Sequence, residues 1–230
     1  MARMITAGTA AGLRREARVD LDAFADNLRL LTARYGEIAL DVRADAHGHS
    51  LDLIATVALD SGVLGFVTSG RSDLPPAGRL TVVSAAAYGV DPGDETRPVM
   101  TVVGEVVSVK PAAVGSGVSY GYSYRTTEDT TLSLIGLGYA DGIPRLASNR
   151  ASVWVGDRQH PLVGRVAMDQ FVVESGSARV SVGDEAVVFG DPAVGHPPAW
   201  EWAEQTRRTA LELIAGIGPR VRRVVGARRG

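Results

Sequence analysis

The sequence predicts an α+β protein in which a short α/β region is followed by a β-rich domain. Two observations support this fold class. Up to about residue 87, short apolar runs alternate with segments whose apolar residues repeat with a helical period. From Arg97 onward the helical period nearly disappears, and short apolar runs recur between Gly and Asp-Gly turns. We therefore expect a parallel sheet with helices first and a compact antiparallel β-domain or barrel second.

The first expected elements are a short strand at 18–21 and a helix that follows it. Asp22 can serve as the N-cap of this helix, and Gly36 fits its C-terminal end. The apolar residues that share one face of the helix are Leu21, Phe24, Leu28 and Leu31.

A β-α-β unit is expected next, from an apolar strand at 38–43 to a second strand at 63–67. The helix between them starts after Ser50 as its cap and ends at Gly62. Its buried side consists of Leu51, Ile54, Val57 and Ala58. Such a unit pairs its strands in parallel through a right-handed crossover. One more strand is expected at 80–87.

The β-rich domain is expected to contain several short strands and one helix. The strands are predicted at 99–108, 130–138, 151–155, 160–163, 170–174 and 184–189. The segment from Trp200 to Ala215 is predicted to form a single amphipathic helix.

Composition excludes several classes of function. The chain has 230 residues, a formal charge of −2 and no cysteine, which rules out disulfides and thiolate catalysis. Near-neutral charge gives no reason to expect nucleic acid as a partner. The N-terminus lacks the apolar stretch of a signal peptide and no run is long enough to span a membrane, so a cytoplasmic protein is the default expectation.

Motifs in the β-rich domain resemble those of alanine racemases. They lie, in order, at 97–101, 118–124 (Val-Ser-Tyr-Gly-Tyr-Ser-Tyr), 138–145 (Gly-Tyr-Ala-Asp-Gly-Ile-Pro-Arg), 163–170 (Val-Gly-Arg-Val-Ala-Met-Asp-Gln), 182–185 and 217–221. In the first half, the strand at 38–43 and the loop Ala46-His47-Gly48-His49 resemble the end of the family's first barrel strand, and 85–89 resembles the end of its last one.

The resemblance implies a truncated TIM barrel followed by an alanine-racemase-like C-terminal β-domain. An eight-stranded barrel usually takes about 250 residues, whereas fewer than about 85 are available here, enough for three strands and two helices. We therefore expect a barrel remnant at 16–96 and the β-domain at 97–226. The missing middle would carry the family's pyridine-nitrogen arginine and most of its phosphate-binding loops.

Arg43 stands where the resemblance places the lysine that holds pyridoxal phosphate (PLP). A guanidinium stays protonated and forms no comparable imine, so loss of the cofactor is expected. Three interpretations of Arg43 remain open: a rim charge, a carboxylate or phosphate binder, or a structural partner of Asp41 or Asp45. His47 and Pro219 replace tyrosines near the family's phosphate site. His47 and His49 lack an evident third ligand, so no metal site is expected.

Tyr120 matches the tyrosine that acts as a general base from the partner subunit in the family. Tyr139, Met168 and Asp169 match residues that the same domain contributes to the facing active site. Without the resemblance, the alternating tyrosines at 120, 122 and 124 would indicate a strand with one tyrosine face.

Three functions follow as hypotheses. The first is a racemase-like binding or assembly module without PLP-dependent activity. The second is an active PLP-dependent alanine or amino-acid racemase. The third is a subunit that lends its C-terminal domain to a full-length alanine racemase. Because three apolar barrel strands cannot close on themselves, a homodimer built on their surface is also expected.

Overall fold

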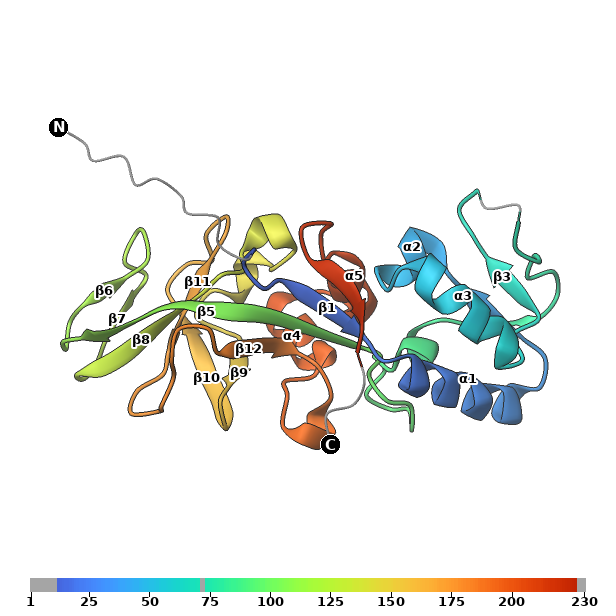
Figure 1. Ribbon diagram of the computed structural model, residues 1–230, viewed down its shortest axis with the longest axis horizontal. Coiled ribbons are helices and arrows are strands. Elements are labelled where there is room, and N and C mark those ends of the chain that lie inside the picture. The colour runs from blue at the N-terminus through green and yellow to red at the C-terminus, as the bar shows by residue number, and fades with distance from the viewer. Residues whose placement is uncertain (1–11, 71–72, 227–230) are drawn as a thin grey trace.

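The computed structural model describes residues 12–70 and 73–226 as two halves that lie side by side. A small parallel sheet with its helices forms one half, at the right of Figure 1, and a β-barrel forms the other. One main hydrophobic core extends through both halves.

The parallel sheet has three strands in the order β3-β2-β4. They are β2 (Ile38–Asp41), β3 (Gly65–Val67) and β4 (Thr81–Val83). Helix α1 (Leu21–Tyr35) precedes β2, and helix α3 (Leu51–Asp60) connects β2 to β3. Both strand pairings are parallel, which confirms the predicted β-α-β unit. The central strand β2 is buried along its whole length.

Helix boundaries in this half differ from the prediction at the caps. The N-cap of α1 is Asp20 rather than Asp22, because Asp20 accepts a hydrogen bond from the amide of Ala23. Ser50 forms no capping hydrogen bond. Asp45 caps α3 instead, since its Oδ1 accepts from the Leu51 amide at 2.8 Å. The predicted strand at 80–87 ends early and continues as the 3-10 helix η1 (Ala85–Tyr88).

The two edges of the parallel sheet are covered differently. The outer edge of β3 is paired by a loop, because Phe66 donates to the Pro75 carbonyl and accepts from the Ala77 amide. Near the edges, Leu64 and Val82 remain 50% and 51% exposed. The chain itself therefore covers one of the open edges expected from sequence.

The barrel consists of six antiparallel strands. They are β5 (Met100–Ala112), β8 (Thr130–Ile135), β9 (Ser152–Val155), β10 (Arg158–Val163), β11 (Phe171–Glu174) and β12 (Glu185–Phe189). The order β12-β9-β10-β11-β8-β5 closes through a β12–β5 pairing. These strands overlap the six that alternation and turn spacing predicted.

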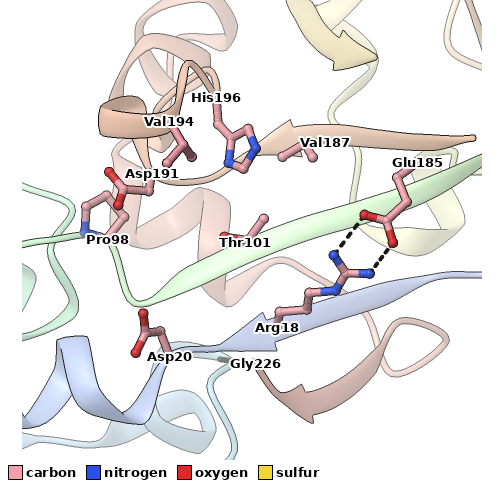
Figure 2. Close-up of a pocket in the computed structure, with 10 residues that line it drawn as sticks. All are labelled: Arg18, Asp20, Pro98, Thr101, Glu185, Val187, Asp191, Val194, His196 and Gly226. Carbon is pink, nitrogen blue, oxygen red and sulfur yellow. Dashed lines mark hydrogen bonds and ion pairs between the residues drawn. The ribbon is translucent and has the colours of Figure 1, made fainter. Parts of the chain in front are cut away.

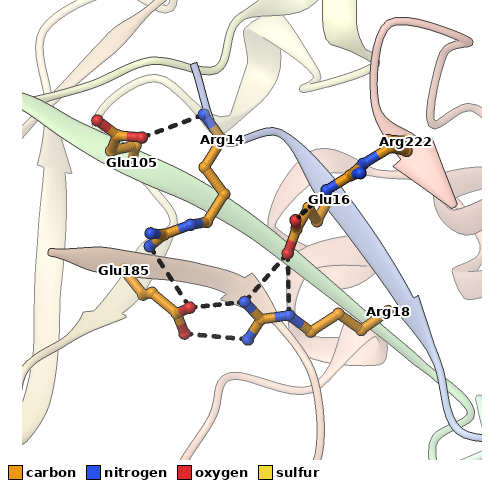
Figure 3. Close-up of polar contacts among 6 residues, drawn as sticks. All are labelled: Arg14, Glu16, Arg18, Glu105, Glu185 and Arg222. Carbon is orange, nitrogen blue, oxygen red and sulfur yellow. Dashed lines mark hydrogen bonds and ion pairs between the residues drawn. The ribbon is translucent and has the colours of Figure 1, made fainter. Parts of the chain in front are cut away.

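Two strands from opposite ends of the chain extend the sheet beyond β5. Strand β1 (Glu16–Val19) pairs with β5 and with β13 (Arg222–Val225). The charged network of Figure 3 ties them to the barrel, and its members are Arg14, Glu16, Arg18, Glu105, Glu185 and Arg222. Arg18 binds Glu185 through two hydrogen bonds of 3.0 and 2.6 Å. Burial raises the pKa of Glu16, but hydrogen bonds from Arg222 and Arg18 outweigh it and keep the pKa below its usual value.

The C-terminal helical segment is broken, so the prediction of one helix from 200 to 215 was wrong. Helix α4 (Ala199–Thr206) ends at Arg207, which has a left-handed φ of 55°. Helix α5 (Ala210–Ala215) starts anew with Thr209 as its N-cap. Trp202 is fully buried and donates from Nε1 to the Ser152 carbonyl at 2.9 Å, which fixes α4 against the barrel.

Several short elements complete the fold. They are α2 (Arg43–His47), the hairpin strands β6 (Gly117–Val118) and β7 (Tyr124–Arg125), and the 3-10 helices η2 (Tyr139–Asp141), η3 (Arg145–Ala147) and η4 (Pro192–Val194). Among the described residues, no helix is long and apolar enough to cross a membrane.

Candidate functional site

The turn that follows β2 has an unusual backbone. Four consecutive residues, Ala44 to His47, have positive φ values between 49° and 55°, so α2 is a left-handed turn. Each L-residue in this conformation costs about 1–2 kcal/mol. Short-range bonds hold it: the amide of Gly48 donates to the Ala44 carbonyl, and the Asp45 carboxylate caps α3.

Arg43 is paired with Asp41 at the start of this turn. Its Nε and Nη2 donate to the two carboxylate oxygens of Asp41 at 2.9 and 2.7 Å, and its backbone amide donates at 3.1 Å. Burial raises the pKa of Asp41, but these hydrogen bonds outweigh it and leave the pKa below its ordinary value. Of the three interpretations of Arg43, the structure contains the ion pair with Asp41.

Two histidines and a tyrosine surround this ion pair. His47 Nε2 lies 3.7 Å from Asp41 Oδ2, and burial lowers the pKa of His47. Tyr88 donates its hydroxyl to the Asp41 carbonyl at 2.7 Å. The ring of His49 stacks on Tyr88 with centroids 4.7 Å apart, and its Nδ1 donates to the Ala46 carbonyl. Complete burial lowers the pKa of His49 to about 4. Most polar groups around the Arg43–Asp41 pair thus have a hydrogen-bond or ion-pair partner within the chain.

Tyr120 lies on the barrel half, in the connection between β6 and β7. Tyr122 shares this connection, so the alternative prediction of a strand with a tyrosine face was wrong. Ser119 and Tyr122 have φ values of 59° and 44°, which turn the chain sharply on both sides of Tyr120. The Tyr120 side chain is therefore presented at a hairpin tip, where 48% of the residue is exposed.

Two arginines hold Tyr120 in place. Arg145 donates to the Tyr120 hydroxyl at 3.2 Å, and the hydroxyl in turn donates to the Val166 carbonyl at 3.4 Å. The Arg165 guanidinium lies 5.7 Å from the centre of the Tyr120 ring, within cation–π range. Neither arginine was identified as a site residue from sequence, although both lie in the quoted motifs.

Backbone hydrogen bonds and a shared arginine connect Tyr120 with the segments that carry Tyr139, Met168 and Asp169. The Tyr139 and Ala140 amides donate to the carbonyls of Ala167 and Met168, both at 3.0 Å. Arg145 also lies 5.9 Å from the Tyr139 ring centre. These contacts place the predicted barrel-side residues in one exposed cluster. We call it the Tyr120 cluster, and its members are Tyr120, Tyr139, Met168 and Asp169.

Arg220 connects this cluster to a buried carboxylate. It donates to Asp169 at 2.6 Å and lies 3.2 Å from Asp141. Asp141 is fully buried and accepts from the Gly138 amide, so it supports the turn at 138–142. Arg220 is a further residue near the site that was not identified as a site residue from sequence.

The segment 217–223 lies between the Tyr120 cluster and the Arg43 turn. On one side of it, Arg220 binds Asp169. On the other side, Arg223 donates to the Gly48 carbonyl at 2.8 Å and to the Gly218 carbonyl at 2.7 Å. The two groups of predicted site residues are therefore separate within one chain and are joined by this segment.

A cavity of about 220 Å³ lies where β1, β5 and the loop before α4 meet (Figure 2). Its charged groups already have partners in the chain. Arg18 and Glu185 bind each other, while Asp20 and Asp191 cap α1 and η4. We therefore assign no ligand to this cavity.

Comparisons with known proteins agree with the motifs of the barrel half. A family model described as alanine racemase, C-terminal domain, matches residues 99–225. A curated alanine racemase from Thermobifida fusca is 38% identical over 193 residues, which cover 81% of this chain and 52% of that protein. Another, from Streptomyces coelicolor, is 46% identical over 147 residues, which cover 60% of this chain and 38% of that protein. The chain spans about half the length of the curated relatives that it covers most fully.

The fold is also that of solved alanine racemases. The enzyme from D-cycloserine-producing Streptomyces lavendulae aligns with a TM-score of 0.86 at 23% identity, over 95% of this chain and 98% of that chain. At this identity the likeness concerns the fold alone.

Proposed function

Because the chain belongs to the alanine racemase family, we propose that it is a member without PLP-dependent racemase activity that acts as a binding or assembly module. The pairing of Arg43 with Asp41 carries this proposal. By resemblance, the family has its PLP-binding lysine at the position of Arg43. Here the side chain is a guanidinium held by two hydrogen bonds to a buried carboxylate.

The residues present do not fit PLP as a covalently held cofactor. An imine requires an amine that can lose its proton, and arginine does not supply one. The chain has one lysine, Lys110, and it lies on β5 of the barrel rather than in the Arg43 turn. We therefore derive no catalytic step through this cofactor.

A second candidate function is a subunit that presents its Tyr120 cluster to a full-length alanine racemase. Its members are exposed together: Tyr120, Tyr139 and Met168 are 48%, 40% and 52% exposed, and the Asp169 side chain is 53% exposed. In the family, the matching residues act on the active site of the facing subunit. Exposure of the whole group favours such a partner.

The parallel sheet favours a truncated barrel and a homodimer as further parts of the proposal. The order β3-β2-β4 places the strand that resembles the family's first barrel strand between its neighbours. In a closed barrel, the first strand pairs with the second and the last. Exposed Val82 on the open edge of β4 is a contact that a second copy would cover. Light scattering at micromolar concentration tests the dimer, and a monomeric mass would refute it.

The loss of racemase activity is tested by titrating the purified full chain with PLP. We expect no saturable aldimine absorbance, no single borohydride-reduced adduct in the mass spectrum and no racemisation of L-alanine. Lys110→Arg serves as the control that identifies non-specific adducts. A one-to-one adduct together with racemase turnover would overturn the proposal in favour of an active racemase.

The partner hypothesis is tested by complementation. A full-length racemase whose own residue corresponding to Tyr120 is changed to phenylalanine is mixed with this chain. Regained activity, absent when Tyr120→Phe is added instead, supports a mixed dimer. Failure of the two proteins to co-elute would refute this second function without affecting the first.

A further inference from the structure

A second, small apolar cluster lies outside the main core, under the hairpin of β6 and β7. It consists of Val118, Leu132 and Val163, and it is separate from the core that fills the barrel. A cavity of about 260 Å³ lies here between the hairpin and strands β5, β8 and β11. We call it the hairpin pocket.

Strand register explains why the walls of the hairpin pocket are apolar on one side and polar on the other. Lys110 pairs opposite Leu132 and Ser108 opposite Leu134, so these four side chains share one face of the sheet. Val172 of β11 pairs opposite Leu134 and continues this face. Leu132, Leu134 and Val172 thus provide an apolar wall beside Lys110.

Three polar side chains of this pocket have no partner among the described residues, whereas the charged side chains of the cavity in Figure 2 do. Within residues 12–70 and 73–226, no side-chain hydrogen bond or ion pair is formed by Lys110, Ser108 or Gln170, all of which line the pocket. Glu174 lies on the same face of the sheet, and its carboxylate accepts a hydrogen bond from the Tyr124 hydroxyl at 2.6 Å. That hydrogen bond raises the pKa of Tyr124 to about 12.

We propose that the hairpin pocket binds a small carboxylate with an apolar body. The Lys110 ammonium would bind the carboxylate, because hydrogen bonds to charged partners are stronger than neutral ones. Ser108 and Gln170 add neutral polar groups, and the apolar wall takes the body of the ligand. The volume is below the roughly 300–1,000 Å³ of drug-sized ligand sites, which limits the occupant to a small acid.

The position of the pocket connects it to the Tyr120 cluster. Ser119 lines the pocket and immediately precedes Tyr120, and Gln170 immediately follows Asp169. An acid in the pocket would therefore contact both segments that carry the cluster. The binding site itself does not depend on the proposed function of the chain, since it involves neither Arg43 nor a partner protein.

The test is a titration of the ¹⁵N-labelled full chain with benzoate, followed by two-dimensional NMR. We expect saturable shifts of the Lys110, Ser119 and Gln170 amides, with the Arg43 turn unaffected. Lys110→Met, which removes the charge at an exposed position, should weaken binding about threefold to fivefold. Lys110→Arg keeps the charge and should bind as tightly as the wild type. Benzamide, the neutral analogue, should bind about threefold to fivefold more weakly than benzoate.

Several results would overturn the inference. They are an absence of saturable shifts, equal binding of benzamide and benzoate, or unchanged affinity in Lys110→Met. Equal thermal unfolding midpoints for the wild type and both variants ensure that a lost affinity reports the pocket rather than the fold. Racemase activity or its absence has no bearing on any of these results.

Discussion

The Arg43 turn and the Tyr120 cluster both contain residues that sequence predicted as site residues, yet their side chains have different surroundings. In the turn, Arg43 binds Asp41 and His49 is buried against Tyr88. In the cluster, Tyr120 and Met168 are about half exposed. The turn is held by the buried groups Asp41 and His49, although the Arg43 side chain itself is 57% exposed, whereas the side chains of the cluster are exposed as a group.

The buried groups of the turn therefore contribute to stability, and the exposed groups of the cluster are available for recognition. Buried polar groups contribute to stability only while their partners and protonation states are maintained. Exposed aromatic and cationic groups contribute little to stability and remain available for binding. Substitutions in the turn should therefore change folding strongly, and substitutions in the cluster should hardly change it.

The largest expected effect is an acid-dependent loss of stability caused by His49. Its pKa in the folded protein is about 4, whereas an unfolded histidine titrates near 6.5. As the pH falls, the unfolded chain therefore binds a proton at His49 before the folded chain does. The stability that neutral His49 contributes is complete above about pH 6.5 and is lost as the pH falls toward 4. This one group should account for about 3 kcal/mol over that range.

The measurement is the free energy of unfolding by urea between pH 4 and 7 for the wild type and His49→Gln. Burial also lowers the pKa values of His47, His160 and His196, so only the difference between the two curves reports His49. Parallel curves would show that the turn is open to water and would remove the contrast with the cluster.

A smaller effect is expected from Asp41→Asn. The change removes the charged acceptor of Arg43 and should lower the free energy of unfolding by about 1–3 kcal/mol at neutral pH. Because the pKa of Asp41 lies below its ordinary value, the wild type keeps this stabilisation above about pH 4 and loses it as pH falls further. Urea unfolding at pH 3 and 7 measures both effects.

The control for Asp41→Asn is Asp157→Asn, which breaks an exposed pair with Arg158. An exposed pair contributes about 0–1 kcal/mol. If both variants lose equally little stability, the Arg43 pair is a surface contact and Asp41 does not hold the turn.

The smallest expected effect concerns Arg165 and Tyr120. A double-mutant cycle with Arg165→Met and Tyr120→Leu should give a coupling energy of about 0.5–1 kcal/mol, as for an exposed cation–π contact. The four proteins are compared by urea unfolding, with Arg158→Met as a variant distant from the cluster. A coupling above about 2 kcal/mol would mean that the cluster serves the fold.

Much of the barrel could be predicted from sequence because its strands alternate in burial and are separated by turns. Strand β9 (Ser152–Val155) buries every second residue, as a strand with one face to the core does. The predicted strand at 130–138 continues past its observed end at Ile135, since Gly136 begins the approach to η2. The four predicted site residues of the cluster came from motifs, and all of them lie on the barrel half of the molecule.

The elements that sequence did not predict depend on distant contacts. Helix α1 begins after Asp20 rather than after Asp22, because the Asp20 amide donates to the Val99 carbonyl and so fixes where β1 ends. The left-handed turn after β2 has no local glycine at its four positive-φ residues. It is held by contacts with α3 and with Arg223, which lies 175 positions from Gly48.

The motifs and their order were enough to identify the family, and Arg43 was enough to set a chemical limit, since no conformation makes a guanidinium into an imine-forming amine. Tertiary structure determined which polar side chains have hydrogen-bond or ion-pair partners and which have none among the described residues. Asp41 rather than Asp45 binds Arg43, and the Lys110 side chain has no partner among the described residues. These outcomes depend on strand register and burial, which local sequence does not specify because they arise between segments far apart in the chain.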